Sequence, residues 1–94
     1  MKQRESLFKT RVLRDLEATP DSYVLKTQER GRRGVPDILM CKKGQFIALE
    51  LKISTGIVSK LQRHTLKRIL ASGGHAIVVT PESWPLQLSI IREM

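Results

Sequence analysis

The spacing of apolar residues along the chain predicts three helices and four strands. Apolar positions recur at the helical period in residues 5–16 and 58–72, and again from Ser83 onward. Short, strongly apolar runs between turn residues are typical of buried strands, and they cover residues 23–27, 36–41, 45–53 and 75–80. The predicted order is therefore α-β-β-β-α-β-α. The segment LQLSII also alternates like a strand over its first four residues, which leaves a strand open there.

The connections between these elements favour a mixed sheet. A tight turn at 42–44, with Gly44 at an unusual backbone angle, joins the second and third strands into a hairpin. The third and fourth strands are joined through a helix, so we expect them to be parallel, with a right-handed crossover. The fourth strand is apolar in its middle and is expected to be central, with helices covering both faces of the sheet. In the last helix we expect Ser83 as N-cap and Pro85 in the first turn.

Composition adds a strong basic charge to this picture. Seventeen Lys and Arg residues against nine Asp and Glu residues give a formal net charge of +8 and a sequence pI near 10.3. That balance favours a polyanionic partner such as nucleic acid, although a generally basic, solvated surface would give the same numbers. No apolar run approaches the roughly 20 residues that span a bilayer, so a membrane partner is not expected. The 94 residues allow one small domain over 1–94.

Cysteine usage and the N-terminal segment indicate a reducing compartment. Cys41 is the single cysteine, so no intrachain disulfide is possible. The segment MKQRESLFK has no apolar stretch of the kind found in secretory signals. The sequence therefore predicts a cytoplasmic setting.

Three charged residues interrupt the apolar strands: Asp37, Glu50 and Lys52. Side chains alternate along a strand, so Glu50 and Lys52 point the same way, and the hairpin brings them beside Asp37. Burying these charges without partners would cost several kcal/mol each, and the two acids repel one another. A divalent cation such as Mg²⁺ would neutralise them, and a lysine beside it can orient a water molecule. The alternative is a Glu–Lys pair on a solvated strand face, with Asp37 as a turn residue.

The apolar arcs of the first two helices each contain polar residues. Glu5 lies among the apolar residues of the first helix, and Lys9 follows one turn later, so an i,i+4 ion pair is one interpretation. Gln62 lies within the apolar arc of the second helix, where a polar side chain needs a hydrogen-bond partner. The opposite arc of that helix is basic and is either a solvated face or a track for phosphates; it comprises Lys60, Arg63, His64, Lys67 and Arg68.

These residues together resemble the PD-(D/E)XK nuclease superfamily. VPD at 35–37 and ELK at 50–52 match the motif that names it, and Glu5 and Gln62 occupy the expected flanking helices. Within the superfamily the chain looks most like the VRR-NUC domain, the virus-type replication-repair nuclease, because SxxQ at 59–62 also matches. Holliday junction resolvases are similar relatives. The resemblance implies an α/β, restriction-endonuclease-like core of α-β-β-β-α-β order, with a mixed central sheet flanked by helices.

The resemblance also implies a metal site. Asp37 and Glu50 would ligate Mg²⁺ or Mn²⁺, with the backbone carbonyl of Leu51 as a further ligand. Lys52 would position the attacking water and stabilise charge on the scissile phosphate. Glu5 matches the acidic residue of the first helix in the family and would hold a water on the metal or a second ion.

Other positions would support that site. Gln62 would brace it through hydrogen bonds, and Gly34 would let the backbone pass close to it. His64 and His75 are not expected to be ligands, because hard metals favour oxygen donors.

We therefore expect a metal-dependent, structure-selective DNA endonuclease that acts on branched DNA such as four-way junctions. A homodimer would supply two sites for two strands, and the apolar segment from Trp84 to Ile91 is the expected contact. A non-catalytic nucleic-acid-binding module and a metal-dependent RNase on the same scaffold remain alternatives. The side chains expected to contact nucleic acid are Lys26, Arg30, Arg32, Arg33, Lys60, Arg63 and Lys67.

Overall fold

The computed structural model describes residues 2–27, 34–53 and 57–94. The elements appear in the predicted order: α1 (Lys2–Glu17), β1 (Ser22–Lys26), β2 (Ile38–Lys42), β3 (Gln45–Leu51), α2 (Lys60–Ala71), β4 (His75–Val79) and α3 (Trp84–Glu93). The α/β class is therefore confirmed, and the segment that left a strand open is helical. Among the helices described, none has the length and apolarity needed to cross a membrane.

The four strands form a single mixed sheet in the order β1-β2-β3-β4. The pairs β1–β2 and β2–β3 are antiparallel, and β3–β4 is parallel, as expected from the helical connection. The predicted central position of β4 is wrong, because β4 lies at the edge of the sheet. Its apolar residues are only partly covered: Val79 is fully buried, whereas Val78 on the opposite face is 40% exposed.

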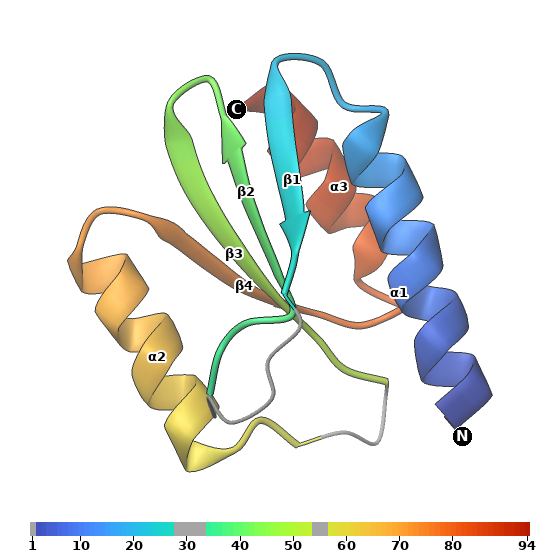
Figure 1. The fold of residues 1–94 in the computed structure, drawn as a ribbon, viewed down its shortest axis with the longest axis vertical. Helices are drawn as coiled ribbons and strands as arrows, with labels where there is room; N and C mark the ends of the chain where they lie inside the picture. The colour runs from blue at the N-terminus through green and yellow to red at the C-terminus, as the bar shows by residue number, and fades with distance from the viewer. Residues whose placement is uncertain (1, 28–33, 54–56) are drawn as a thin grey trace.

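Helices lie on both sides of the sheet but cover the two faces unequally (Figure 1). α1 and α3 lie side by side on one face, and the main core forms there. α2 lies on the other side, next to β4, and Leu66 is its buried residue. The core cluster between the sheet, α1 and α3 comprises Phe8, Val12, Leu16, Ile38, Met40, Ile47, Leu49, Leu51, Val79, Trp84 and Ile91.

The placement of α3 corrects the expected apolar contact surface and confirms the expected N-cap position. Trp84 and Ile91 are fully buried, so this segment does not offer the continuous apolar surface expected of it. Trp84 instead donates its indole N–H to Asp15 Oδ2 at 2.9 Å, which ties α3 to α1. Ser83 occupies the N-cap position, but its hydroxyl makes no capping bond to α3 and accepts the N–H of Thr80 at 2.9 Å.

The hairpin turn and the start of β2 both bear on the position of Asp37. Lys43 and Gly44 have φ of 50° and 81°, so both turn residues adopt the left-handed conformation typical of a two-residue hairpin. β2 begins at Ile38 rather than at Pro36. The carbonyl of Asp37 accepts the N–H of Thr27 at 3.0 Å, which holds the preceding residues beside β1. Asp37 therefore lies just outside the strand, at the mouth of the hairpin.

Gly34 lets the chain approach α2 closely before it enters β2. Its φ is +79°, and a Cβ there would lie 2.7 Å from Leu61 Cγ and 3.2 Å from the Leu61 carbonyl oxygen. Both the backbone angle and the space therefore require glycine. The contact holds the segment that leads to Asp37 against the helix that carries Gln62.

Gly34→Ala should be more destabilising than a matched change at Gly44, which has the same kind of backbone angle and no atom within 4 Å of an added Cβ. Gly44→Ala should lower the free energy of unfolding by about 1–2 kcal/mol through backbone strain alone. Gly34→Ala should lower it by a further ~1–3 kcal/mol, because Leu61 must move. Urea unfolding followed by circular dichroism measures both. Equal losses would show that the close approach to α2 contributes nothing.

Candidate active site

Asp37 and Glu50 converge where β2 begins and β3 ends. The register pairs Ile38 with Leu49, so Asp37 lies opposite Glu50, one position further along. Asp37 Oδ2 accepts the backbone N–H of Leu51 at 2.8 Å, which fixes the carboxylate against β3. The convergence predicted from strand alternation is therefore present in the structure.

Glu50 is a buried carboxylate held by two donors. Its side chain is 3% exposed, and Lys52 Nζ lies 3.5 Å from Glu50 Oε2. Gln62 Nε2 donates to the same oxygen at 2.5 Å. Glu50 and Lys52 thus point the same way, and Gln62 meets Glu50 from α2, as the sequence predicted for a polar residue on that arc.

Gln62 is itself locked by the start of α2. Ser59 is the N-cap; its hydroxyl accepts the N–H of Gln62 at 3.1 Å, and Gln62 Oε1 accepts the N–H of Ser59 at 2.9 Å. This reciprocal capping box uses the amide oxygen, so the amide nitrogen must point away from the helix start. It points to Glu50. The SxxQ motif therefore has a physical reason, since one side chain both caps α2 and orients a carboxylate.

The pKa of Glu50 is raised from 4.5 to about 7, chiefly by burial and also by the nearby charge of Asp37, against the opposing effects of Lys52 and Lys9. A pKa this high means that the lysines near Glu50 do not offset the cost of ionising it. A positive charge close to Asp37 and Glu50 would restore ionisation, because opposite charges favour the charged form of an acid.

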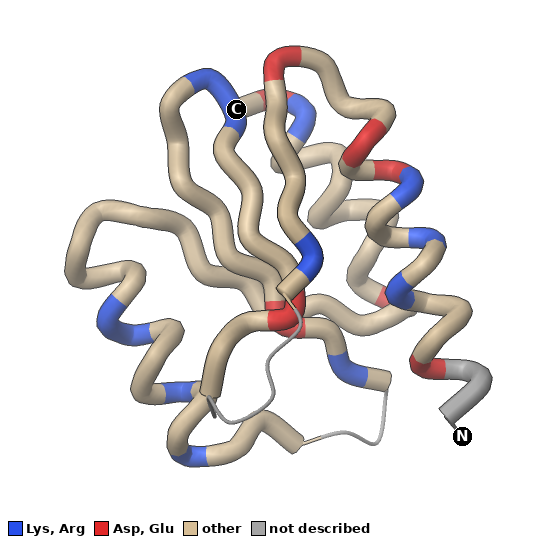
Figure 2. The backbone as a smooth tube through the Cα atoms, in the orientation of Figure 1, with Lys and Arg blue, Asp and Glu red and all other residues tan. Residues whose placement is uncertain are grey.

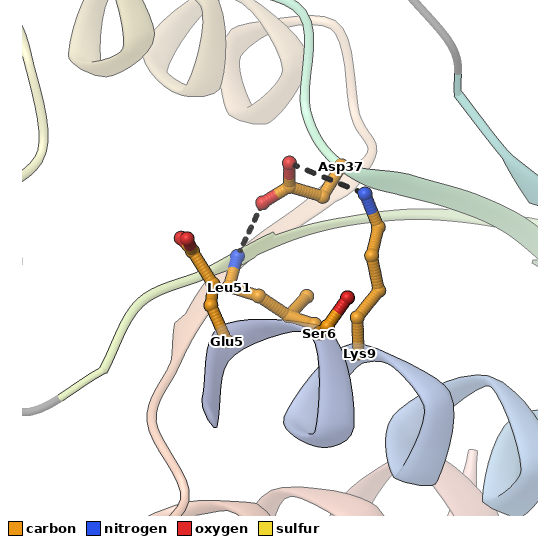
Figure 3. A pocket seen from close by; sticks show the side chains of 5 residues that line it. All are labelled: Glu5, Ser6, Lys9, Asp37 and Leu51. Carbon is orange, nitrogen blue, oxygen red and sulfur yellow. Dashed lines mark hydrogen bonds and ion pairs between the residues drawn. The ribbon is translucent and has the colours of Figure 1, made fainter. Parts of the chain in front are cut away.

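α1 supplies the remaining wall of the site. A pocket of about 190 Å³ lies between α1 and the carboxylates. Figure 3 shows the five residues that line it, which are Glu5, Ser6, Lys9, Asp37 and Leu51. Lys9 Nζ lies 4.0 Å from Asp37 Oδ1. Among the described residues Glu5 and Lys9 form no ion pair with each other, so the local i,i+4 interpretation is wrong. Lys9 is the site residue that sequence reasoning missed, although its position on the apolar arc beside Glu5 was a signal for it.

The donor set suits a hard divalent cation. Within the described residues, the hydrogen bonds from protein donors reach Asp37 through Oδ2 and Glu50 through Oε2, so each carboxylate keeps an oxygen without such a bond. Oxygen donors of this kind are those that Mg²⁺ and Mn²⁺ prefer. No group of three or more His, Cys, Asp or Glu side chains in the described part of the chain is close enough to form a ready metal cluster. Any cation there would need water or phosphate oxygens as further ligands.

The basic residues expected to contact nucleic acid lie around this site rather than in it. Figure 2 shows acidic segments where the strands converge and basic segments along α2. Lys26, Lys60, Arg63 and Lys67 are exposed. Arg30, Arg32 and Arg33 lie outside the described residues.

The two histidines stand apart from the carboxylates. His64 is exposed on α2. The His75 ring nitrogen Nε2 lies 2.9 Å from Gln45 Oε1, at the opposite end of β3 from Glu50. Neither histidine lines the pocket beside Asp37.

Comparison with known proteins shows the fold. No family model and no curated protein matches the chain. The structure is similar to a solved structure titled "VRR_NUC domain", with a TM-score of 0.74 and 23% sequence identity, over 95% of this chain and 94% of that chain. The α/β fold implied by the sequence resemblance is thus confirmed over nearly the whole chain.

The raised pKa of Glu50 predicts a distinctive pH dependence of stability. In the metal-free folded protein Glu50 keeps its proton up to about pH 7, whereas the unfolded chain releases it near 4.5. The folded state therefore binds more protons between these values, and the free energy of unfolding should fall as pH rises from 4.5 through about 7. The fall attributable to Glu50 should be on the order of 3 kcal/mol.

Urea unfolding in EDTA at several pH values would measure this fall in wild type and in Glu50→Gln, which cannot ionise. The difference between the two proteins isolates Glu50 from other titrating groups. Parallel pH profiles for the two proteins would contradict the assignment of a raised pKa to Glu50.

Proposed function

We propose that this protein is a metal-dependent nuclease that hydrolyses phosphodiester bonds in DNA. The observation that carries the proposal is the pair of carboxylates, Asp37 and Glu50, with Glu50 buried and its pKa raised to about 7. Such a pair is fully ionised at neutral pH only when a nearby positive charge offsets the repulsion, and perturbed acids of this kind concentrate at functional sites. The likeness to the solved VRR_NUC domain supports the same reaction class.

Each residue of the site has a role in this proposal. Asp37, Glu50 and the carbonyl of Leu51 would hold Mg²⁺ or Mn²⁺, and Glu5 faces the same pocket from α1. A bound divalent cation supplies charge neutralisation at the phosphate and lowers the pKa of water. Lys52, 3.5 Å from Glu50, orients the attacking water and faces the charge that develops on the phosphate.

Gln62 acts through Glu50 rather than on the substrate. By donating to Glu50 Oε2 it holds the carboxylate in one orientation and leaves the other oxygen for the cation. It is a positioning residue, comparable to the outer-shell partners that orient metal ligands elsewhere.

We further propose branched DNA, such as a four-way junction, as the substrate. The net charge of +8 supports a polyanionic partner, and the phosphate contacts would come from exposed basic residues around the site. Those residues are Lys26, Lys60, Arg63 and Lys67, together with Arg30, Arg32 and Arg33 from outside the described residues. In the cleavage assay below, a non-catalytic binding module would cut no substrate, and an RNase on the same scaffold would cut RNA alone.

Asp37→Asn and Lys52→Ala should both impair cleavage but differ in metal binding. Asp37→Asn removes a ligand and should abolish cleavage while nearly preserving DNA affinity. Lys52→Ala should slow single-turnover cleavage by about 10²–10⁴-fold with roughly unchanged metal affinity, because its role is in the chemical step. The exposed Glu93→Gln on α3 is the matched control and should behave as wild type.

The assay titrates Mg²⁺ or Mn²⁺ against labelled four-way junction, flap, duplex, single-strand and RNA substrates. Preferential cleavage of junctions supports the substrate proposal. Undiminished cleavage by Asp37→Asn would defeat the site assignment, and cleavage of RNA alone would move the protein to the RNase alternative.

We propose that the active form is a homodimer, with its contact on the outer face of the sheet. Tyr23, Leu25 and Phe46 are 70%, 48% and 44% exposed. The strand pairing sets Tyr23 level with Cys41, and Cys41 level with Phe46, so the exposed face crosses β1, β2 and β3. It continues into an open groove of about 830 Å³ against α2. Large exposed apolar patches of this kind mark interaction sites, and a second copy would cover it.

Leu25→Lys should convert the dimer to a monomer, whereas Leu86→Lys should not. Leu86 is the matched control, since it is 66% exposed on α3, where the sequence had placed the contact. The groove is also lined by Lys26, His64 and Arg68. A two-fold axis would bring these basic residues near their copies in the second subunit, where they repel one another. Added salt screens charges, so it should strengthen dimerisation and weaken DNA binding. Analytical ultracentrifugation at micromolar concentration and several salt concentrations measures this. A monomeric wild type would contradict the dimer. Dissociation by Leu86→Lys but not by Leu25→Lys would show that the contact lies on α3.

A further inference from the structure

Lys9 is the second ammonium group at the candidate site. It extends from α1 into the pocket that Glu5, Ser6, Asp37 and Leu51 also line (Figure 3). Its Nζ lies 4.0 Å from Asp37 Oδ1, and its side chain is 30% exposed. Lys52 pairs with Glu50 from the strand side, so each of the two carboxylates faces one lysine.

The contact between Lys9 and Asp37 is not needed to hold Asp37 in place. Asp37 Oδ2 already accepts the N–H of Leu51 at 2.8 Å, a shorter and directional bond. An ion pair at 4.0 Å whose side chains are 30% and 32% exposed adds little to stability, because solvent screens it. The ammonium of Lys9 instead faces Oδ1, the oxygen that a divalent cation would use. Lys9 and the cation therefore compete for the same atom.

We propose that Lys9 is a phosphate-contacting residue, which neutralises Asp37 while no divalent cation is present and turns to a phosphate of the nucleic acid once a cation takes Asp37 Oδ1. The phosphate half of this inference rests on the proposed function. Lysine suits the exchange, because its ammonium is a point charge with three donors on a flexible four-carbon stem. A phosphate that enters the pocket comes close to the carboxylates of Glu5 and Asp37, which repel it. The flexible ammonium group of Lys9 offsets that repulsion.

The competition can be measured without DNA. Lys9→Met keeps the apolar stem and a good helix former, Lys9→Arg keeps the charge, and Arg11→Met removes an exposed charge elsewhere on α1. In a Mn²⁺ titration followed by electron paramagnetic resonance, Lys9→Met should bind Mn²⁺ about two- to fivefold more tightly, because a screened competing charge is gone. Lys9→Arg and Arg11→Met should bind it within twofold of wild type. Unchanged or weaker Mn²⁺ binding by Lys9→Met overturns the competition.

The phosphate contact is measured by the salt dependence of DNA binding, with Ca²⁺ as a cation in place of Mg²⁺. Fluorescence anisotropy with a labelled junction should give a log–log salt slope about one unit smaller for Lys9→Met than for wild type with Ca²⁺. In EDTA the two slopes should agree, because Lys9 is then held at Asp37. Equal slopes under both conditions, in a wild-type protein that binds and cleaves DNA, overturn the Lys9 assignment alone. A wild type that binds no DNA overturns the proposed function and the phosphate contact together.

Discussion

The arrangement of the candidate site depends on the amide of Gln62. Its oxygen accepts the N–H of Ser59 and so fixes the first turn of α2, and its nitrogen donates to the buried Glu50 on β3. One planar group thus joins a helix start to a strand end. Because Gly34 packs against Leu61 of the same helix, the segment leading to Asp37 is placed relative to α2 as well. Both carboxylates are therefore positioned relative to α2.

That positioning leaves an electrostatic conflict at the mouth of the hairpin. The sheet buries Glu50 beside Asp37, and the two lysines nearby do not bring the pKa of Glu50 back to its usual value. A protein selected for stability alone would gain by replacing Glu50 with an apolar residue, since the neighbouring strand positions are apolar and buried. Where local chemistry opposes packing in this way, function is the usual reason.

Periodicity and strand alternation were sufficient for the element order, the parallel β3–β4 pair and the convergence of Asp37 and Glu50, whereas the place of Gln62 at the site came from the family resemblance. They failed for β4, because the apolar pattern of a strand indicates that its faces are buried but not whether a second strand pairs with its other edge. They failed for Lys9 for a different reason. On a helix, sequence reasoning finds partners three or four residues away, whereas Asp37 reaches Lys9 only through the tertiary packing of α1 against the sheet. The exposed outer face of the sheet was missed because the sequence predicts that a helix lies on that side but not how it is oriented, and the orientation decides how much of the sheet it covers.

The site is assembled from three segments that lie far apart in the sequence: Glu5 and Lys9 come from α1, Asp37 and Glu50 from the hairpin, and Gln62 from α2. α1 packs on α3 through Asp15 and Trp84, so its placement depends on the last helix. Contacts of such long sequence separation form late, after the loops between them have closed. A nascent or partly folded chain would therefore carry the basic charge that attracts nucleic acid without a completed set of acids. Under the proposed function, hydrolytic competence would be acquired only once α1, the hairpin and α2 have packed together, so a partly folded chain would bind without cutting.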